Sequence, residues 1–346
     1  MRIINYVLIF TVLVFTSCED DPLKKVDVSE SKLEVRFDRF DHDIFNADFT
    51  DPARTGQQLY QKYRGFYCDY MEVILQAARC QPDSNFAVLE GFVSHRDMRA
   101  LQLQIDKLYN TDKINEVNDE FTDAIRRWNH FFPDSIAPNV VYMNSGLNFS
   151  AYSTDSIISV GLDFFLGPQD SIVKLFPNDV FPQYFKDDMR PDYLVVNAMK
   201  DFSWAQCNKS DRNTRGATLL DLIVQQGKVM YMLDALMPMT EDSTKMNWST
   251  ENMEWAKANE WSVWKELAKQ EVLFEKEYNN NKKWIDFGPF TNIGAIPQDS
   301  PSQLGIWLGW KMVRAYMKEN PSITIQQLLA EKDSQKILKA FKPEKP

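Results

Sequence analysis

The chain has 346 residues and a net charge of −10 at neutral pH, since 49 acidic residues outnumber 39 Lys and Arg residues. A net-acidic chain without a basic block argues against nucleic acid as a partner and against charge-driven binding to anionic lipid. Only 12 residues are Gly, and long apolar side chains are abundant, which favours helices over a turn-rich β-barrel.

The first seventeen residues have the layout of a secretory signal peptide. Arg2 supplies a positive start, residues 3–15 are largely apolar, and small or hydroxylated residues directly precede Cys18. A signal that ends on Cys resembles the lipobox of bacterial lipoproteins, which implies cleavage before Cys18 and acylation of its thiol. The segment is too short for a stable transmembrane helix. The alternative is an ordinary signal peptide followed by a chance Cys.

Residues 18–32 are polar and predict a flexible tether between the lipid and the domain. Alternating apolar residues after Leu33 predict a strand within 33–45, followed by a turn. Besides Cys18, the mature chain has Cys68, Cys80 and Cys207. Cys68 and Cys80 stand on one predicted helical stretch that would separate them by about 18 Å, beyond disulfide reach. We therefore expect buried thiols, or else a bridge from Cys207 to one of the other two.

Residues 52–128 are predicted to be mainly helical, because apolar side chains recur at three- and four-residue steps. Pro133 and Pro138 end this region. Residues 138–167 hold three short apolar runs separated by Asn, Ser, Gly and Asp, which predict a small antiparallel meander as the one clear sheet.

Helices resume after Gly167. We expect one from Pro191, a long apolar one from Thr218 to Pro238, and one over residues 251–274 capped by Ser249 or Thr250. Residues 300–303 (SPSQ) and 324–327 (TIQQ) have the spacing of capping boxes. Gly305 and Gly309 would share a helix face that packs closely inside the domain, with a partner surface as the alternative. Trp255, Trp261 and Trp264 would form a core-facing stripe. No linker interrupts residues 33–346, so the fold class is α+β, mostly helical, in one domain.

The sequence singles out no catalytic site. Its three histidines, His42, His95 and His130, lie in different segments, and neither H-E-x-x-H nor G-x-S-x-G occurs. Phosphate-binding glycine motifs and C-x-x-C are also missing from the sequence. We therefore expect no cofactor and no metal site.

An ordered set of segments resembles the gliding-motility lipoprotein GldB family. The matching segments are VRFDRFDHDIF (35–45), ISVGLDFFLG (158–167), MRPDYLVVNAMKDF (189–202), TLLDLIVQQGKVMYMLDALMP (218–238), ENMEWAKANEWSVWKEL (251–267) and SPSQLGIWLGWKMVRAYMKENPSITIQQLL (300–329). The resemblance covers essentially the whole mature domain and is weakest over residues 52–130. It implies an envelope protein linked to gliding and the associated secretion apparatus.

That family in turn looks like a distant relative of H-E-x-x-H zinc peptidases, which implies a degenerate gluzincin-like fold. In the matching register Asn197 stands at the first His, Ala198 at the catalytic Glu and Asp201 at the second His. Gln226, before Gly227, stands at the third ligand. This set lacks the imidazoles and the general base that a zinc peptidase requires.

These observations predict a lipid-anchored, non-enzymatic pseudo-peptidase domain that serves as an accessory of the gliding and secretion machinery. Its partners would be the membrane, through lipid on Cys18, and envelope proteins, on the periplasmic side or the cell surface. Two alternatives stay open: a divergent envelope hydrolase that uses acidic residues, and a glycan-binding surface lipoprotein that uses its tryptophans.

Overall fold

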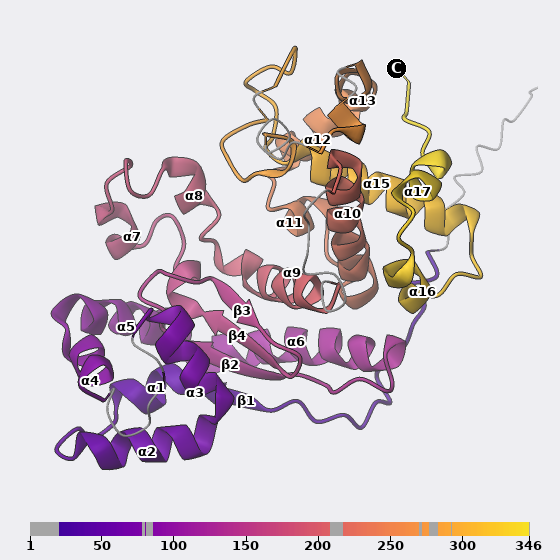
Figure 1. Cartoon of the computed structure of the whole chain (residues 1–346). Coiled ribbons are helices and arrows are strands. Elements are labelled where there is room, and N and C mark those ends of the chain that lie inside the picture. Colours follow the sequence, from indigo (N-terminus) through magenta and orange to yellow (C-terminus); the bar gives the residue numbers. More distant parts are fainter. Residues whose placement is uncertain are drawn as a thin grey trace, which may run out of the picture.

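A four-stranded mixed sheet lies at the centre of the molecule (Figure 1). The computed structural model describes residues 21–77, 80, 86–207, 217–269, 272–276, 283–291 and 293–345. The strands are β1 (Phe37–Arg39), β2 (Asn139–Met143), β3 (Ala151–Ser153) and β4 (Ile157–Gly161), in the order β1-β2-β4-β3. The predicted signal peptide (1–17) and Cys18 lie outside the described residues.

The predicted antiparallel meander is wrong in topology, although its three strands exist. β2 pairs in parallel with both β1 and β4, and only β3 is antiparallel to its neighbour β4. The strand expected after Leu33 is β1, and it forms one edge of this same sheet. It is short because the helix α1 (Phe40–Phe45) begins directly after it. Strands β2 and β4 are buried along nearly their whole length, as central strands covered on both faces are.

Helices between β1 and β2 form the N-terminal part of the molecule. Buried residues between Phe40 and Val93, together with Val141 and Met143 of β2, make a second hydrophobic cluster, while the helices over residues 96–131 pack into the main core. The region is helical as predicted. Its elements are α2 (Pro52–Tyr63), α3 (Gly65–Asp69), a π-helical turn (Tyr70–Ile74), α4 (Phe86–Ser94), α5 (Arg96–Leu108) and α6 (Thr111–Phe131).

Cys68 and Cys80 form a disulfide, whereas the sequence predicted three buried thiols or else a bridge from Cys207. The prediction assumed one continuous helix through both residues, but the helix ends at Ile74 and the chain turns back, leaving the two Cα atoms 5.1 Å apart. Cys207 is the free thiol among the described residues. Burial raises the pKa of this thiol to about 12, which favours its protonated form.

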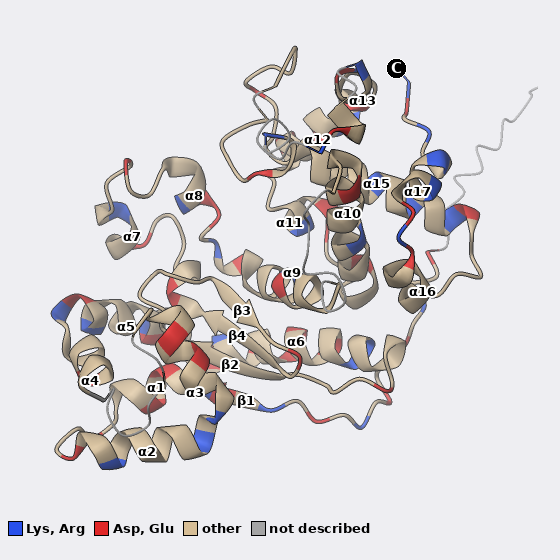
Figure 2. Cartoon of the chain, in the orientation of Figure 1, with Lys and Arg blue, Asp and Glu red and all other residues tan. Residues whose placement is uncertain are grey.

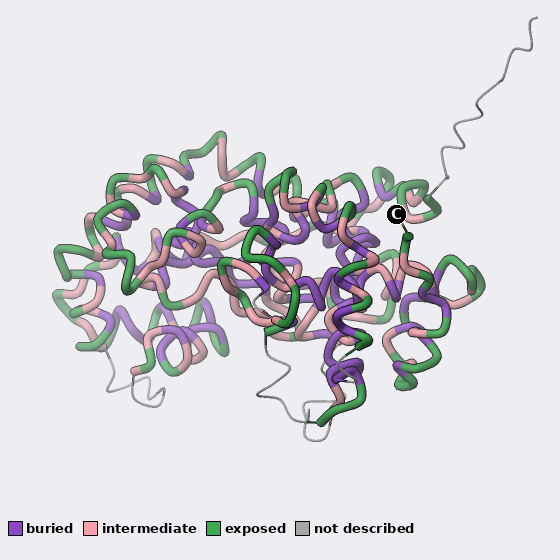
Figure 3. The backbone as a smooth tube through the Cα atoms, turned by 90° about the horizontal axis from the view of Figure 1, so that it is seen from above, coloured by how far each residue is buried: buried purple, intermediate pink, exposed green. Residues whose placement is uncertain are grey.

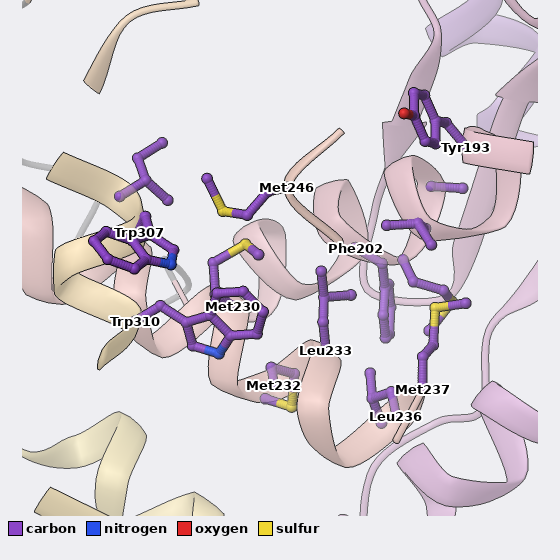
Figure 4. Close-up of a cluster of buried hydrophobic side chains, with 14 of the residues drawn as sticks. Tyr193, Phe202, Met230, Met232, Leu233, Leu236, Met237, Met246, Trp307 and Trp310 are labelled. Carbon is purple, nitrogen blue, oxygen red and sulfur yellow. The ribbon is translucent and has the colours of Figure 1, made fainter. Parts of the chain in front are cut away.

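Two apolar helices, α10 (Leu219–Leu236) and α15 (Leu304–Glu319), form the centre of the main core, and α9 (Leu194–Cys207) lies between α10 and the sheet (Figure 1). Figure 4 shows the tightly packed side chains around Trp310, Leu233 and Phe202. The buried part of the chain runs through this interior while exposed segments lie at the periphery (Figure 3). None of the helices in the described residues is both long and apolar enough to cross a membrane.

Shorter elements complete the fold. They are the 3-10 turns Leu162–Phe165, Pro191–Tyr193 and Val272–Phe274, with α7 (Ser171–Leu175), α8 (Gln183–Asp187), α11 (Asp242–Met246), α12 (Thr250–Ala258), α13 (Glu260–Lys269), α16 (Ile325–Ala330) and α17 (Ser334–Ala340). The single helix expected over 251–274 is thus divided at Asn259. Trp255, Trp261 and Trp264 are half-buried at the margin of the core rather than within it.

The two predicted capping boxes have opposite outcomes. Thr324 and Gln327 form a capping box at the start of α16, as expected. At residues 300–303 the prediction is wrong, because α15 begins only after Gln303, which has a left-handed backbone and makes no side-chain cap. The chain there is shaped by Thr291 instead, whose hydroxyl donates to Pro301 O and accepts from Leu304 N.

Residues 21–32 contact the domain, whereas the sequence led us to expect a free tether. Val28 is buried, and Leu23 packs against the main core. The guanidinium of Arg127 on α6 donates to Leu23 O. The start of the described chain therefore has a fixed position beside α6.

Candidate functional site

A cavity of about 1280 Å³ opens between the end of α10, α11, the start of α12 and the end of α15. Asp21–Lys24 and the last residues of α6 form another part of its wall. This volume is large enough for a ligand or for a segment of a protein partner. The cavity thus brings together parts of the chain that are about 300 residues apart in sequence.

The base of the cavity is a buried charge network centred on Asp234 of α10, which is only 5% exposed. Its carboxylate accepts hydrogen bonds from Lys245 Nζ and Trp310 Nε1, each at 2.8 Å. Arg314 of α15 donates to the same carboxylate through Nε and Nη2, both at 2.7 Å. Arg314 also donates to both oxygens of Asp242, at 2.6 and 2.8 Å. The Arg314 guanidinium lies 3.8 Å from the centre of the Trp310 ring.

Asp242 and Arg314 stabilise each other's charged form. Burial opposes ionisation of Asp242, but hydrogen bonds from Arg314 outweigh it and keep the pKa of this carboxyl below its usual range. Burial also disfavours the charged form of Arg314. The hydrogen bonds to Asp242 and Asp234 outweigh this effect, so the pKa of Arg314 lies above its ordinary value. Burial raises the pKa of Tyr231 on the cavity wall to about 12. The Asp242–Arg314 pair therefore contributes one negative and one positive charge to the cavity wall.

The rim of the cavity combines an apolar side chain with both signs of charge. Met239, three residues after the end of α10, is 78% exposed and lines the cavity. Lys257 and Glu254 of α12 lie on the same wall. Figure 2 shows acidic and basic residues interspersed over these helices rather than segregated by sign. Such a mixed surface fits a protein segment better than a polyanion.

The cavity wall includes the first residues of the described chain. Asp21 forms part of its wall, and Cys18 precedes Asp21 by three residues. Three residues of extended chain reach about 10 Å at most. A lipid on Cys18 would hold this side of the domain near the membrane.

The predicted degenerate-site positions lie on two adjacent helices. Asn197, Ala198 and Asp201 are on α9, and Gln226 is on α10, which packs against α9. Ala198 is fully buried in the main core. Asp201 is half-buried, its Oδ2 has no hydrogen-bond partner, and burial raises its pKa. None of these four residues lines the cavity above.

Among the described residues, Asp41, His42 and Asp106 are the carboxylates and imidazole that lie close enough together to share an ion. Arg39 already occupies this position. Its Nη2 is 2.6 Å from Asp41 Oδ2 and 2.7 Å from His42 Nε2. A guanidinium among the ligand atoms repels a metal cation, so this group is an ion-pair cluster that joins α1 to α5.

Sequence reasoning missed Asp234 and Arg314. The available signal was one charge, Asp234, in the apolar stretch MYMLDALMP and two, Lys311 and Arg314, in the apolar stretch WLGWKMVRAYM. A charge that a helix carries into the core needs an opposite charge or hydrogen bonds there. The sequence does not show that Asp234 and Arg314 pair with each other, because they are 80 residues apart.

Comparison with known protein families gives one match. The family described as gliding motility protein GldB matches residues 21–343, nearly the whole chain. No curated protein matches the chain. No solved structure matches it either.

Proposed function

Because the chain belongs to the gliding motility protein GldB family, we propose that it is a lipid-anchored, non-enzymatic protein of the cell envelope that supports the gliding and secretion machinery. The anchor is Cys18, and the domain binds an envelope protein through the Asp234–Arg314 cavity. The observation that carries the proposal is the family match over residues 21–343.

Three features of the cavity support protein binding. Its charges neutralise one another, its rim exposes Met239, and Asp21 of its wall lies within about 10 Å of chain from the proposed anchor. A partner in or near the same membrane could therefore contact the cavity directly. The degenerate peptidase-like site belongs to the proposal as well, with Asn197, Ala198, Asp201 and Gln226 at the positions that would otherwise carry metal ligands and the general base.

Partner binding is tested by charge substitution on the cavity rim. We expect Met239→Asp, introduced into the native chromosomal copy, to impair surface movement or secretion while the protein level stays normal. Leu103→Asp on α5 is the matched control, because Leu103 is 67% exposed and lies outside the cavity. A photo-cross-linking residue at position 239 should give an adduct with a specific envelope protein, and the same residue at position 103 should not. Equal behaviour of the two positions would refute the proposed binding surface.

The non-enzymatic role is tested separately on the purified protein. Elemental analysis should find no stoichiometric zinc, and a casein-like substrate should remain uncleaved. One tightly bound equivalent of zinc would overturn this part of the proposal and leave the family membership intact.

A further inference from the structure

A second cavity, of about 610 Å³, lies on another side of the main core. It is bounded by the end of α8, the turn between α11 and α12, and the loops at residues 287–289 and 302–303. Its volume is typical of a small-molecule site. It shares no lining residue with the Asp234–Arg314 cavity.

Aromatic side chains line much of this cavity. The rings of Tyr184 and Phe287 are 5.3 Å apart, and Phe287 is 41% exposed. Tyr193 and Trp248 line deeper parts and are each only 5% exposed. An exposed ring over a cavity offers a flat apolar face to a ligand while the walls remain polar.

The polar lining includes amides, hydroxyls and the largely buried carboxylate of Asp188. Asn247 Nδ2 donates to Asp188 Oδ2 at 3.3 Å, and Asn252 and Ser249 lie on the same wall. Burial raises the pKa of Asp188 to about 6, although the bond from Asn247 opposes this effect. These groups supply both donors and acceptors in a small space.

Two backbone positions on the lining are left-handed. Asn247 (φ 55°) is the C-cap of α11, where Asn is common, whereas Gln303 (φ 61°) is a residue type that rarely adopts this conformation. Asn247 Oδ1 and Trp248 Nε1 are buried without a hydrogen-bond partner. Unpaired buried polar atoms in the wall of a cavity leave a donor and an acceptor for a ligand.

The described residues of the lining carry more negative than positive charge, which disfavours an anionic ligand. Asp187, Asp188 and Arg190 are the charged residues that line the cavity. Arg190 is already bonded to Asp192 at 3.1 Å, and its guanidinium lies 5.1 Å from the centre of the Tyr193 ring. No cluster of cations is therefore present on this lining to bind phosphate or a sugar acid.

We propose that the second cavity binds a neutral saccharide, with Phe287 stacking on a sugar face and Asp188, Asn247 and Asn252 binding its hydroxyl groups. A neutral sugar combines an apolar ring face with many hydroxyl donors and acceptors, as this lining requires. The proposal rests on the cavity itself and does not depend on the partner surface proposed above.

The test measures saccharide binding by the mature chain carrying Cys18→Ser, which keeps it soluble without acyl chains. Isothermal titration and saturation-transfer NMR are run with a β-1,4-linked N-acetylglucosamine trisaccharide, maltotriose, inorganic phosphate and trialanine. We expect saturable binding of at least one trisaccharide. Phe287→Ala and Asn252→Ala should each weaken it about 3–10-fold.

The matched control is Phe274→Ala, because Phe274 is 54% exposed and does not line the cavity. This variant should bind as the parent chain does, and circular dichroism should show all variants folded. The proposal fails if neither trisaccharide binds saturably at millimolar concentration. It also fails if Phe287→Ala binds as well as the Phe274 control, or if only phosphate or trialanine binds.

Discussion

Gly227 and Gly309 lie where the backbones of α10 and α15 approach each other closely in the core. A Cβ atom at Gly309 would lie 2.1 Å from Ile223 O, and one at Gly227 would lie 2.3 Å from Gly309 O. Helices α10 and α15 therefore touch backbone to backbone at this point, which only Gly permits. The sequence prediction of close internal packing at Gly309 is confirmed, as it is at Gly305, where a Cβ atom would lie 2.7 Å from Trp284 O.

Gly309→Leu should lower the free energy of unfolding by about 1–3 kcal/mol, because the larger side chain would push α10 and α15 apart. Gly91→Ala is the control. A Cβ atom there meets nothing within 4 Å, so its better helix propensity should stabilise the protein by up to about 1 kcal/mol. Urea denaturation measures both changes. A more stable Gly309→Leu variant would contradict the observed packing.

Asp163 is a fully buried carboxyl that holds the loop after β2. It accepts hydrogen bonds from Ser145 N and Ser145 Oγ, both at 2.9 Å, and from Leu147 N at 2.5 Å. Burial raises its pKa from 3.8 to about 6 despite these bonds. Between these two pH values the folded state therefore binds more protons than the unfolded state does.

Stability contributed by Asp163 should consequently be present below about pH 4 and fall as the pH rises to 6. We expect the stability of the parent chain relative to Asp163→Asn to decrease by about 2–3 kcal/mol from pH 4 to pH 7. Chemical denaturation at several pH values measures this difference. The exposed Asp119→Asn variant should show no comparable trend, and a flat difference for Asp163→Asn would refute the raised pKa.

The helices α10 and α15 begin in different ways, although each is preceded by a possible capping residue. At the start of α10 the Thr218 hydroxyl accepts from Asp221 N at 3.2 Å, and Asp221 Oδ2 accepts from Thr218 N at 2.8 Å. At α15 the Ser300 hydroxyl is buried without a hydrogen-bond partner, and Gln303 begins the helix instead. Similar local sequences thus have different structures, because Thr291 packs against one of them.

Thr218→Ala should destabilise the protein by about 0.5–2 kcal/mol, since it leaves a helix N–H group without its acceptor. Ser300→Ala should change stability by no more than about 0.5 kcal/mol, because its hydroxyl caps nothing. Thermal denaturation of both variants measures the contrast. A loss at Ser300 as large as that at Thr218 would show that residues 300–303 form a capping box after all.

The first described residues contribute to the wall of the charged cavity. Asp21 contributes to the wall of the charged cavity, and the expected anchor Cys18 lies three residues before it. If the anchor is as proposed, the domain cannot move far from the lipid surface. The charged cavity and the membrane would then be separated by no more than a short stretch of chain.

Cys18→Ala should abolish acyl labelling and leave the protein uncleaved or soluble, because no other Cys follows the signal sequence directly. Membrane fractionation and labelling with a fatty-acid analogue measure this. Cys207→Ala is the control and should remain anchored. Equal membrane retention and labelling of the Cys18 variant would contradict the lipoprotein assignment.

The sequence by itself determined the family, the predominance of helix, and the limits of its most periodic segments. The long helix after Thr218 and the close packing at Gly309 follow from local patterns, because capping residues, prolines and glycines act on their immediate neighbours. The signal and Cys18 are likewise local features, and their role stays a prediction.

Only the tertiary structure decided the strand order, the disulfide and both cavities. Parallel pairing of β1 with β2 joins segments about 100 residues apart, and the Cys68–Cys80 bridge depends on where a helix stops. The pairing of Asp234 with Arg314 arises because α10 and α15 pack together, which places two otherwise unfavourable buried charges in contact. Such contacts depend on the sum of packing over the whole core, and no single stretch of sequence contains that information.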